Sequence, residues 1–101
     1  MTNPLLTTVA TEVAGEFGSR LSAILSPTRG RPEDARARAI AMHVYNRVAP
    51  GGLTFTDVGK AFSRDRTTVR HALTRVDGWQ EVEDGFEDRL HEVVGRVRAR
   101  Q

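Results

Sequence analysis

The segment 64–76, Arg-Asp-Arg-Thr-Thr-Val-Arg-His-Ala-Leu-Thr-Arg-Val, constrains the fold of this chain more than any other. Four apolar residues in it recur at i, i+3, i+4 and i+7, the spacing of one buried helix face. They are Val69, Ala72, Leu73 and Val76. At about 100° of rotation per residue, the opposite face carries five polar side chains. These are Thr67, Arg70, His71, Thr74 and Arg75.

The outward face of this helix combines two cations, two hydroxyls and an imidazole, and it holds no carboxylate. Such a face suits a polyanion whose base edges donate and accept hydrogen bonds. Duplex DNA is therefore the first hypothesis for the ligand.

Apolar stripes elsewhere predict further helices and no strand. We expect helices over about 7–17, 21–25, 33–48, 54–62, 65–76 and 81–98, the last with Val82, Phe86, Leu90, Val94 and Val97 on its stripe. Two prolines and a glycine make 26–32 a loop, and Asp77-Gly78 is expected to end the fifth helix. The sequence thus predicts an all-α, compact domain of five or six helices, with residues 1–101 as a single domain.

Residues 54–76 have the arrangement of a helix-turn-helix. Phe55, Val58 and Phe62 are expected to face inward on a short helix, followed by a turn at 63–65 and a second helix capped by Asp65. Many all-helical proteins have two short consecutive helices and bind no DNA, so this spacing alone does not decide the function.

The chain has a net charge of +2, but its charges are unevenly distributed. Residues 29–75 hold ten cations and four anions, a balance of +6. Residues 76–95 hold seven anions and only Arg89, a balance of −6. This asymmetry implies a field that can orient the molecule on a duplex, although two ordinary solvated faces would also produce it.

Several function classes are not expected. Without cysteine, and with three scattered histidines, no metal site is predicted, and no nucleophile pairs with a base. The chain has no G-x-x-x-x-G-K-S/T phosphate loop, so we expect no enzyme activity, no cofactor and no bound nucleotide. No apolar run approaches about 18 residues and no signal peptide is visible, which predicts no membrane contact and a cytoplasmic, nucleoid-associated protein.

The start of a recognition helix usually enters the major groove. Arg66 can donate two hydrogen bonds to a guanine or one to a phosphate, and Thr67 and Thr68 offer hydroxyls and methyl groups. Support of the helix cap is the alternative role for Thr67 or Thr68. Asp65 is expected to cap the helix or to orient Arg66, although a carboxylate can also accept from cytosine N4.

Other basic side chains are expected at the DNA backbone or in the minor groove. Phosphate contacts are predicted for His71, Arg70, Arg75, Lys60 and Arg31. Arg29, on the basic loop, is expected to reach into the minor groove, unless that loop is simply solvated. The terminal arginines Arg96, Arg98 and Arg100 complement the negative end of the last helix, and DNA contact by them is the alternative.

The segment 64–72 resembles the signature of the C-terminal DNA-binding domain of the bacterial replication initiator DnaA, Arg-Asp-His-Thr-Thr-Val followed by any residue and His-Ala. Residues 55–62 are similar to the first helix of its helix-turn-helix, and the similarity extends weakly from about Val9 to Val97. The resemblance implies base-reading positions for Asp65, Arg66, Thr67 and Thr68, and a phosphate position for His71. It also implies a minor-groove position for Arg29, and backbone contacts for Phe55 and Thr56. Because the family's histidine is Arg66 here, we expect a target site that differs from the DnaA box.

Without the initiator's ATPase motif, the chain looks like a free-standing version of the module. Activators of gene transfer agents in alphaproteobacteria, which pair such a module with a partner similar to the RNA polymerase omega subunit, resemble it. We therefore expect a sequence-specific regulator of transcription that binds double-stranded DNA. It would activate by recruiting RNA polymerase or an omega-like co-activator through its acidic residues 81–94. The alternatives are a plain solvated acidic face, a replication regulator that competes for initiator boxes, and a protein-interaction module without DNA binding.

Overall fold

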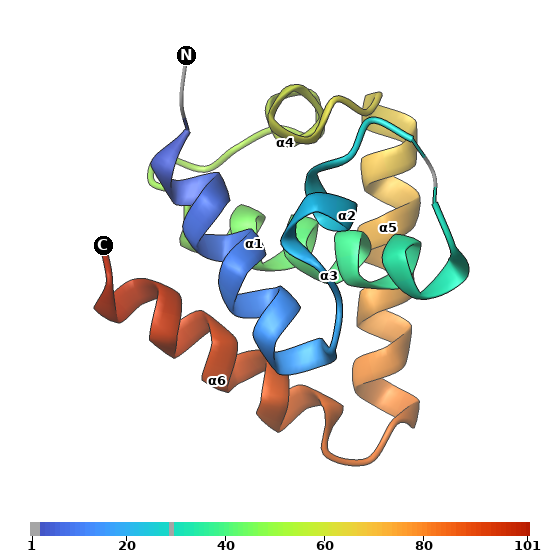
Figure 1. The fold of residues 1–101 in the computed structure, drawn as a ribbon, viewed down its shortest axis with the longest axis vertical. Helices are drawn as coiled ribbons and strands as arrows, with labels where there is room; N and C mark the ends of the chain where they lie inside the picture. The colour runs from blue at the N-terminus through green and yellow to red at the C-terminus, as the bar shows by residue number, and fades with distance from the viewer. Residues whose placement is uncertain (1–2, 29) are drawn as a thin grey trace.

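Six α-helices follow one another in the computed structural model, which describes residues 3–28 and 30–101 (Figure 1). They are α1 (Pro4–Phe17), α2 (Leu21–Leu25), α3 (Pro32–Val48), α4 (Phe55–Phe62), α5 (Arg66–Val82) and α6 (Phe86–Ala99). No strand occurs among the described residues. The all-α prediction is confirmed, with six helices.

Helix α3 is the centre of the molecule, because α1, α2, α4, α5 and α6 all pack against it. Its own buried residues include Ile40 and Val44, which are fully covered. Around them lie aliphatic side chains of the other helices, namely Val9, Val13, Ile24, Val58, Val69, Val76, Leu90, Val93 and Val97. This core fixes the orientation of α4 and α5, the two helices of the predicted helix-turn-helix.

Helix starts follow from local sequence. The Asn3 side chain accepts a hydrogen bond from the Leu6 amide (3.1 Å) and caps α1. Helix α3 begins with Pro32 itself, which fits because the first helical position needs no N–H donor. The Thr54 hydroxyl caps α4 by accepting a hydrogen bond from the Asp57 amide (3.1 Å), and the Asp57 carboxylate accepts one from the Thr54 amide (3.1 Å).

The predicted end of the fifth helix is wrong. Helix α5 continues through Asp77 and Gly78 to Val82, and α6 begins at Phe86 rather than near residue 81. The reason is a tertiary contact, because the Trp79 ring packs edge-on against Phe86, with ring centroids 6.1 Å apart. This packing holds the last turns of α5 in place and offsets the cost of a helical glycine, about 1 kcal/mol.

Two apolar side chains lie elsewhere than expected. Val82 ends α5 instead of joining the stripe of the last helix, and it is 77% exposed. Phe55 is 42% exposed at the start of α4, whereas Val58 and Phe62 point inward as predicted. Within residues 3–28 and 30–101, no helix has both the length and the apolar character that a membrane span requires.

Candidate nucleic-acid interface

The turn between α4 and α5 is built on a close backbone approach. The Arg64 amide donates to the Gly59 carbonyl (2.8 Å), and Ser63 adopts a left-handed backbone (φ 57°) that ends α4. A Cβ atom at Gly59 would overlap the Arg64 carbonyl oxygen. Position 59 therefore requires glycine, and the two helices meet in a tight turn as predicted.

Asp65 caps the second helix. Its Oδ1 accepts a hydrogen bond from the Thr68 amide (2.7 Å), which confirms the predicted cap. Hydrogen bonding by the Thr68 amide holds the pKa of Asp65 below its ordinary value, so the carboxylate is charged at neutral pH. A charged cap stabilises the helix start that carries the candidate base-reading residues.

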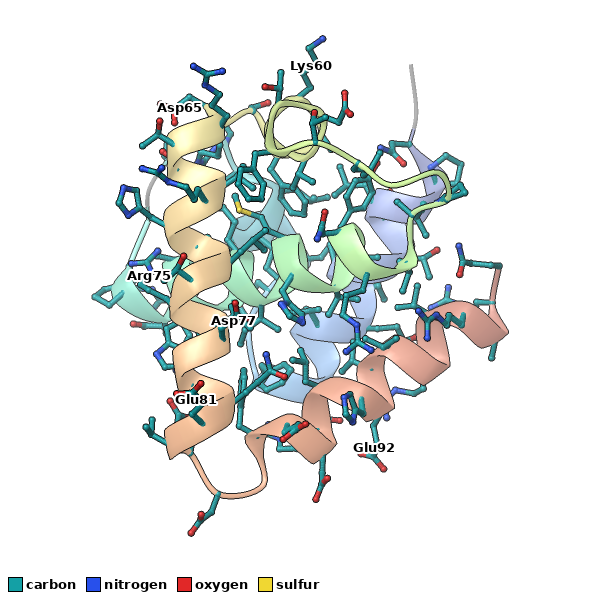
Figure 2. All side chains as sticks on the ribbon, turned by 180° about the vertical axis from the view of Figure 1, so that it is seen from behind. Lys60, Asp65, Arg75, Asp77, Glu81 and Glu92 are labelled. Carbon is teal, nitrogen blue, oxygen red and sulfur yellow. The ribbon has the colours of Figure 1, made fainter. Side chains whose placement is uncertain are left out.

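The outward face of α5 is as predicted. Val69, Ala72 and Val76 are buried and Leu73 is half-buried. The candidate DNA-contacting side chains on this helix are all exposed, namely Arg66, Thr67, Thr68, Arg70, His71 and Arg75. Thr56 and Lys60 are exposed on α4. Figure 2 shows Lys60 and Asp65 at the same end of the molecule, with Glu81 far along α5 from them.

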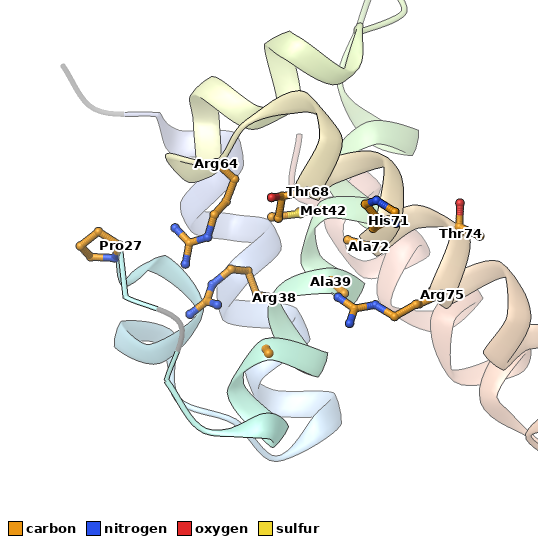
Figure 3. A pocket seen from close by; sticks show the side chains of 11 residues that line it. Pro27, Arg38, Ala39, Met42, Arg64, Thr68, His71, Ala72, Thr74 and Arg75 are labelled. Carbon is orange, nitrogen blue, oxygen red and sulfur yellow. The ribbon is translucent and has the colours of Figure 1, made fainter.

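A groove of about 600 Å³ runs between α5, α3 and the segment that contains Pro27 (Figure 3). Its lining includes the guanidinium groups of Arg38, Arg64 and Arg75 and the imidazole of His71. Thr68 and Thr74 add hydroxyls, and Ala39, Met42 and Ala72 add apolar surface. The groove therefore combines positive charge and hydroxyl donors beside the exposed face of α5.

Comparison with known proteins identifies the family. The family described as bacterial dnaA protein helix-turn-helix matches residues 6–76, which include most of α1, all of α2 to α4 and most of α5. The chain belongs to this family. Its matched region ends at residue 76, so the last turns of α5 and all of α6 lie beyond it.

A similar protein is the chromosomal replication initiator protein DnaA of Rickettsia africae (strain ESF-5). It is 36% identical over 81 residues, which make up 79% of this chain and 17% of that protein. The chain thus spans less than a fifth of the length of this relative. Membership of the dnaA helix-turn-helix family supports DNA binding.

Two arginines, Arg38 of α3 and Arg64 in the turn of the dnaA-type helix-turn-helix, have roles that sequence analysis did not foresee. Arg38 is 4% exposed and donates to the carbonyls of Ala23 (2.7 Å) and Ile24 (3.1 Å). Burial, together with the charge of Arg64, lowers the pKa of Arg38. Its position on the buried stripe, between Ala35 and Met42 at helical spacing, was the available signal. Arg64 also donates to backbone carbonyls of the 26–28 segment.

The structure describes the basic loop on either side of Arg29. Arg29, the predicted minor-groove residue, lies outside the described residues. Arg31 is exposed, and its guanidinium pairs with Glu33 (3.4 Å) and Asp34 (3.6 Å). It also lines a recess of about 240 Å³ together with Arg75. The fold thus brings Arg31 close to the same helix as the other candidate residues.

The acidic stretch is divided by the structure. Glu81, Asp84, Glu87, Asp88 and Glu92 are exposed on the last turns of α5 and on α6 or the turn between them. Glu83, in contrast, accepts two hydrogen bonds from Arg36 (2.7 and 3.0 Å), whose guanidinium stacks 4.2 Å from the Trp79 ring centroid. Within the predicted acidic face, Glu83 is therefore held in an ion pair inside the protein, whereas the other five carboxylates are exposed.

The terminal arginines are engaged within the protein. Arg96 pairs with Glu12 (3.0 Å) and Glu16 (2.8 Å), and Arg100 pairs with Glu12 (2.7 Å). Arg89 pairs with Glu16 (3.0 Å). These contacts join α6 to α1. They favour an intramolecular role for the cations of α6 over DNA contact.

Proposed function

We propose that this protein is a sequence-specific regulator of transcription that binds double-stranded DNA. The observation that carries the proposal is the exposed start of α5 on a dnaA-type helix-turn-helix, where cations and hydroxyls gather. The exposed carboxylates of residues 81–92 lie toward the other end of α5 and on α6, so their repulsion by phosphate orients the molecule with the start of α5 on the duplex.

Base reading is assigned to Asp65, Arg66, Thr67 and Thr68, in the first turn of α5. A recognition helix inserts this turn into the major groove, where an arginine pairs with guanine N7 and O6. Replacing Arg66 by alanine should relax the sequence preference at one base position and weaken specific binding by about 1–3 kcal/mol. Binding that weakens equally for all sequences would contradict this assignment, as measured by competition with single-base variants of the site.

Phosphate contacts are assigned to exposed groups on either side of the first turn of α5. His71 and Arg75 line the groove beside α5, and Arg70 is exposed on the same helix. Lys60, Thr56 and Phe55 lie on α4, with the last two at its N-terminus, where free amide groups favour an anion. Arg31 would contact phosphate from the edge of α3, and Arg29 would enter the minor groove.

The activating step is assigned to recruitment. The exposed carboxylates Glu81, Asp84, Glu87, Asp88 and Glu92 lie beyond the start of α5, on its last turn, on α6 and in the turn between them, and Val82 is exposed at the end of α5. This surface is open to RNA polymerase or an omega-like co-activator once the protein is on DNA. Reversing two charges, Glu87→Lys with Asp88→Lys, should abolish activation in a purified transcription assay while leaving DNA affinity intact or higher.

A second candidate is replication control by competition for initiator boxes. The similarity to the Rickettsia initiator protein favours it. The two candidates differ in target: the competitor binds initiator boxes, whereas a regulator with Arg66 in place of the family's histidine prefers a different, guanine-containing site.

The deciding experiment is selection from a random duplex library. The wild type should enrich a defined motif, and a Thr67→Ala/Thr68→Ala variant should lose it. The matched control is Thr7→Ala/Thr11→Ala, which removes two exposed threonines from α1. A folded wild type that enriches nothing would overturn the proposal in favour of a protein-interaction module, and enrichment of initiator boxes would favour replication control.

A further inference from the structure

One guanidinium joins the helix-turn-helix to the loop that precedes α3. Nη1 of Arg64 donates to the carbonyls of Phe62 (3.1 Å) and Ser63 (3.2 Å), in its own turn. Nη2 donates to the carbonyls of Ser26 (3.1 Å) and Thr28 (3.0 Å). The side chain thus connects two backbone segments that lie 36 and 38 residues apart in sequence.

The segment held by Arg64 is also held from the other side. Helix α2 has only five residues, so its last carbonyls have no partner within the helix. Arg38 donates to two of them, those of Ala23 and Ile24. Figure 3 shows both arginines pointing toward the segment that carries Pro27. Residues 23–28 are therefore fixed by arginines from α3 and from the turn before α5.

The chemistry of this contact requires arginine. A guanidinium offers five donors in a planar fork, and it can serve two pairs of carbonyls at once. A lysine ammonium keeps the charge but is a point donor on a flexible stem, so it cannot hold both segments in one geometry.

Arg64 immediately precedes Asp65, the cap of α5, and Thr28 lies three residues before Arg31. We propose that Arg64 is a positioning residue that couples residues 26–28, and Arg31 beyond them, to the start of α5, so that Arg31 and the recognition helix bind DNA as one rigid surface. This inference rests on the proposed function. If the Arg64 contact is loosened, Arg31 should therefore contribute less to DNA binding, while the contribution of the recognition helix is unchanged.

The test is a double-mutant cycle on the selected DNA site. In the wild type, Arg31→Ala should weaken binding about fivefold, and in an Arg64→Lys background it should have an effect of less than about twofold. The matched cycle uses Arg66→Ala, whose effect should be the same in both backgrounds. The salt slope of Arg64→Lys should fall by about one unit although its charge is unchanged, because the loop contact is lost.

Additive effects of Arg31→Ala and Arg64→Lys, with an unchanged salt slope, would show that Arg64 is only structural and would overturn the coupling. Amide hydrogen exchange gives a readout without DNA: protection of the Ser26 and Thr28 amides should fall in Arg64→Lys while that of α5 is kept. If Arg64→Lys does not fold, Arg64→Gln, a shorter donor, is measured in its place. Wild-type protein that binds no duplex would overturn the proposed function and the coupling together, whereas wild-type binding with an additive cycle overturns the coupling alone.

Discussion

At the level of single residues, the helix-turn-helix depends on the missing side chain of Gly59. This residue is buried in α4, and a Cβ atom there would overlap the backbone of Arg64. The obstacle is a carbonyl of the turn, which cannot move without shifting the start of α5. Gly59→Ala should therefore lower the free energy of unfolding by about 1–3 kcal/mol, as measured by urea denaturation.

The control for this substitution is Gly95→Ala. Gly95 is exposed in the middle of α6 and has no atom within 4 Å of an added Cβ. There the better helix propensity of alanine should raise the free energy of unfolding by about 0.5–1 kcal/mol. Equal and favourable effects at positions 59 and 95 would contradict the close approach of α4 to the turn.

The sequence predicted the role of a residue where that role depends only on neighbours in the same helix or turn. The Asp65 cap and the exposed side chains of α5 follow from spacing along one helix, and both are confirmed. Arg38 and Arg64 could not be assigned in that way. Both donate to carbonyls of the segment 23–28, at least 14 residues away, and only tertiary packing, including that of α2 against α3, brings this segment into reach.

At the level of helices, the start of α5 is stabilised by the charge of Asp65. Asp65→Ala should lower the free energy of unfolding by about 1 kcal/mol at neutral pH. Because the folded-state pKa of Asp65 is depressed, its contribution is complete above the ordinary aspartate pKa of about 3.9 and is lost as the pH falls through the lower folded-state value. Urea denaturation of both proteins from neutral pH to about pH 3 measures this difference. A difference that stays constant over that range would contradict a charged cap.

Helix α5 also shows where sequence patterns fail. Asp77-Gly78 is a typical stop signal, but Trp79 packs on Phe86 and under the guanidinium of Arg36, and the helix continues. The helix propensity of a residue is a weak local preference, and tertiary packing of this kind overrides it. Apart from the start of α6, which is displaced together with the end of α5, the other helix boundaries needed no long-range partner, and the sequence predicts them to within a few residues.

The continuation of α5 can be tested at Gly78, which is exposed and has open space around an added Cβ. Inside a helix, Gly78→Ala should raise the free energy of unfolding by about 0.5–1 kcal/mol. If the helix instead ended there with glycine in a left-handed cap, alanine would lower stability by a similar amount. Thermal unfolding of the two proteins distinguishes these signs.

At the level of the whole molecule, the cations of the predicted DNA face and the exposed carboxylates of residues 81–92 lie in different places. The cations and hydroxyls of the predicted DNA face lie on α4 and on α5 as far as Arg75, with the exposed Asp57 and Asp65 among them, whereas the exposed carboxylates of residues 81–92 lie on the last turn of α5, on α6 and in the turn between them. The sequence predicted this separation. It did not reveal that Glu12 and Glu16 of α1 engage the arginines of α6, since those pairs join residues 73 to 88 positions apart.

This separation predicts that position, rather than net charge, governs DNA affinity. Arg70 and Arg98 are both exposed cations, but Arg70 lies on the proposed DNA face, whereas Arg98 lies on α6 and donates to the Arg47 carbonyl (3.4 Å). Each change to alanine removes one positive charge. Arg70→Ala should weaken binding to all sequences alike and reduce the slope of log K against log salt by about one unit, because one phosphate contact is lost. Arg98→Ala should leave the slope unchanged, as measured by fluorescence titration at several salt concentrations. Equal reductions in the two variants would mean that the net charge of the molecule, and not the face of α5, attracts the duplex.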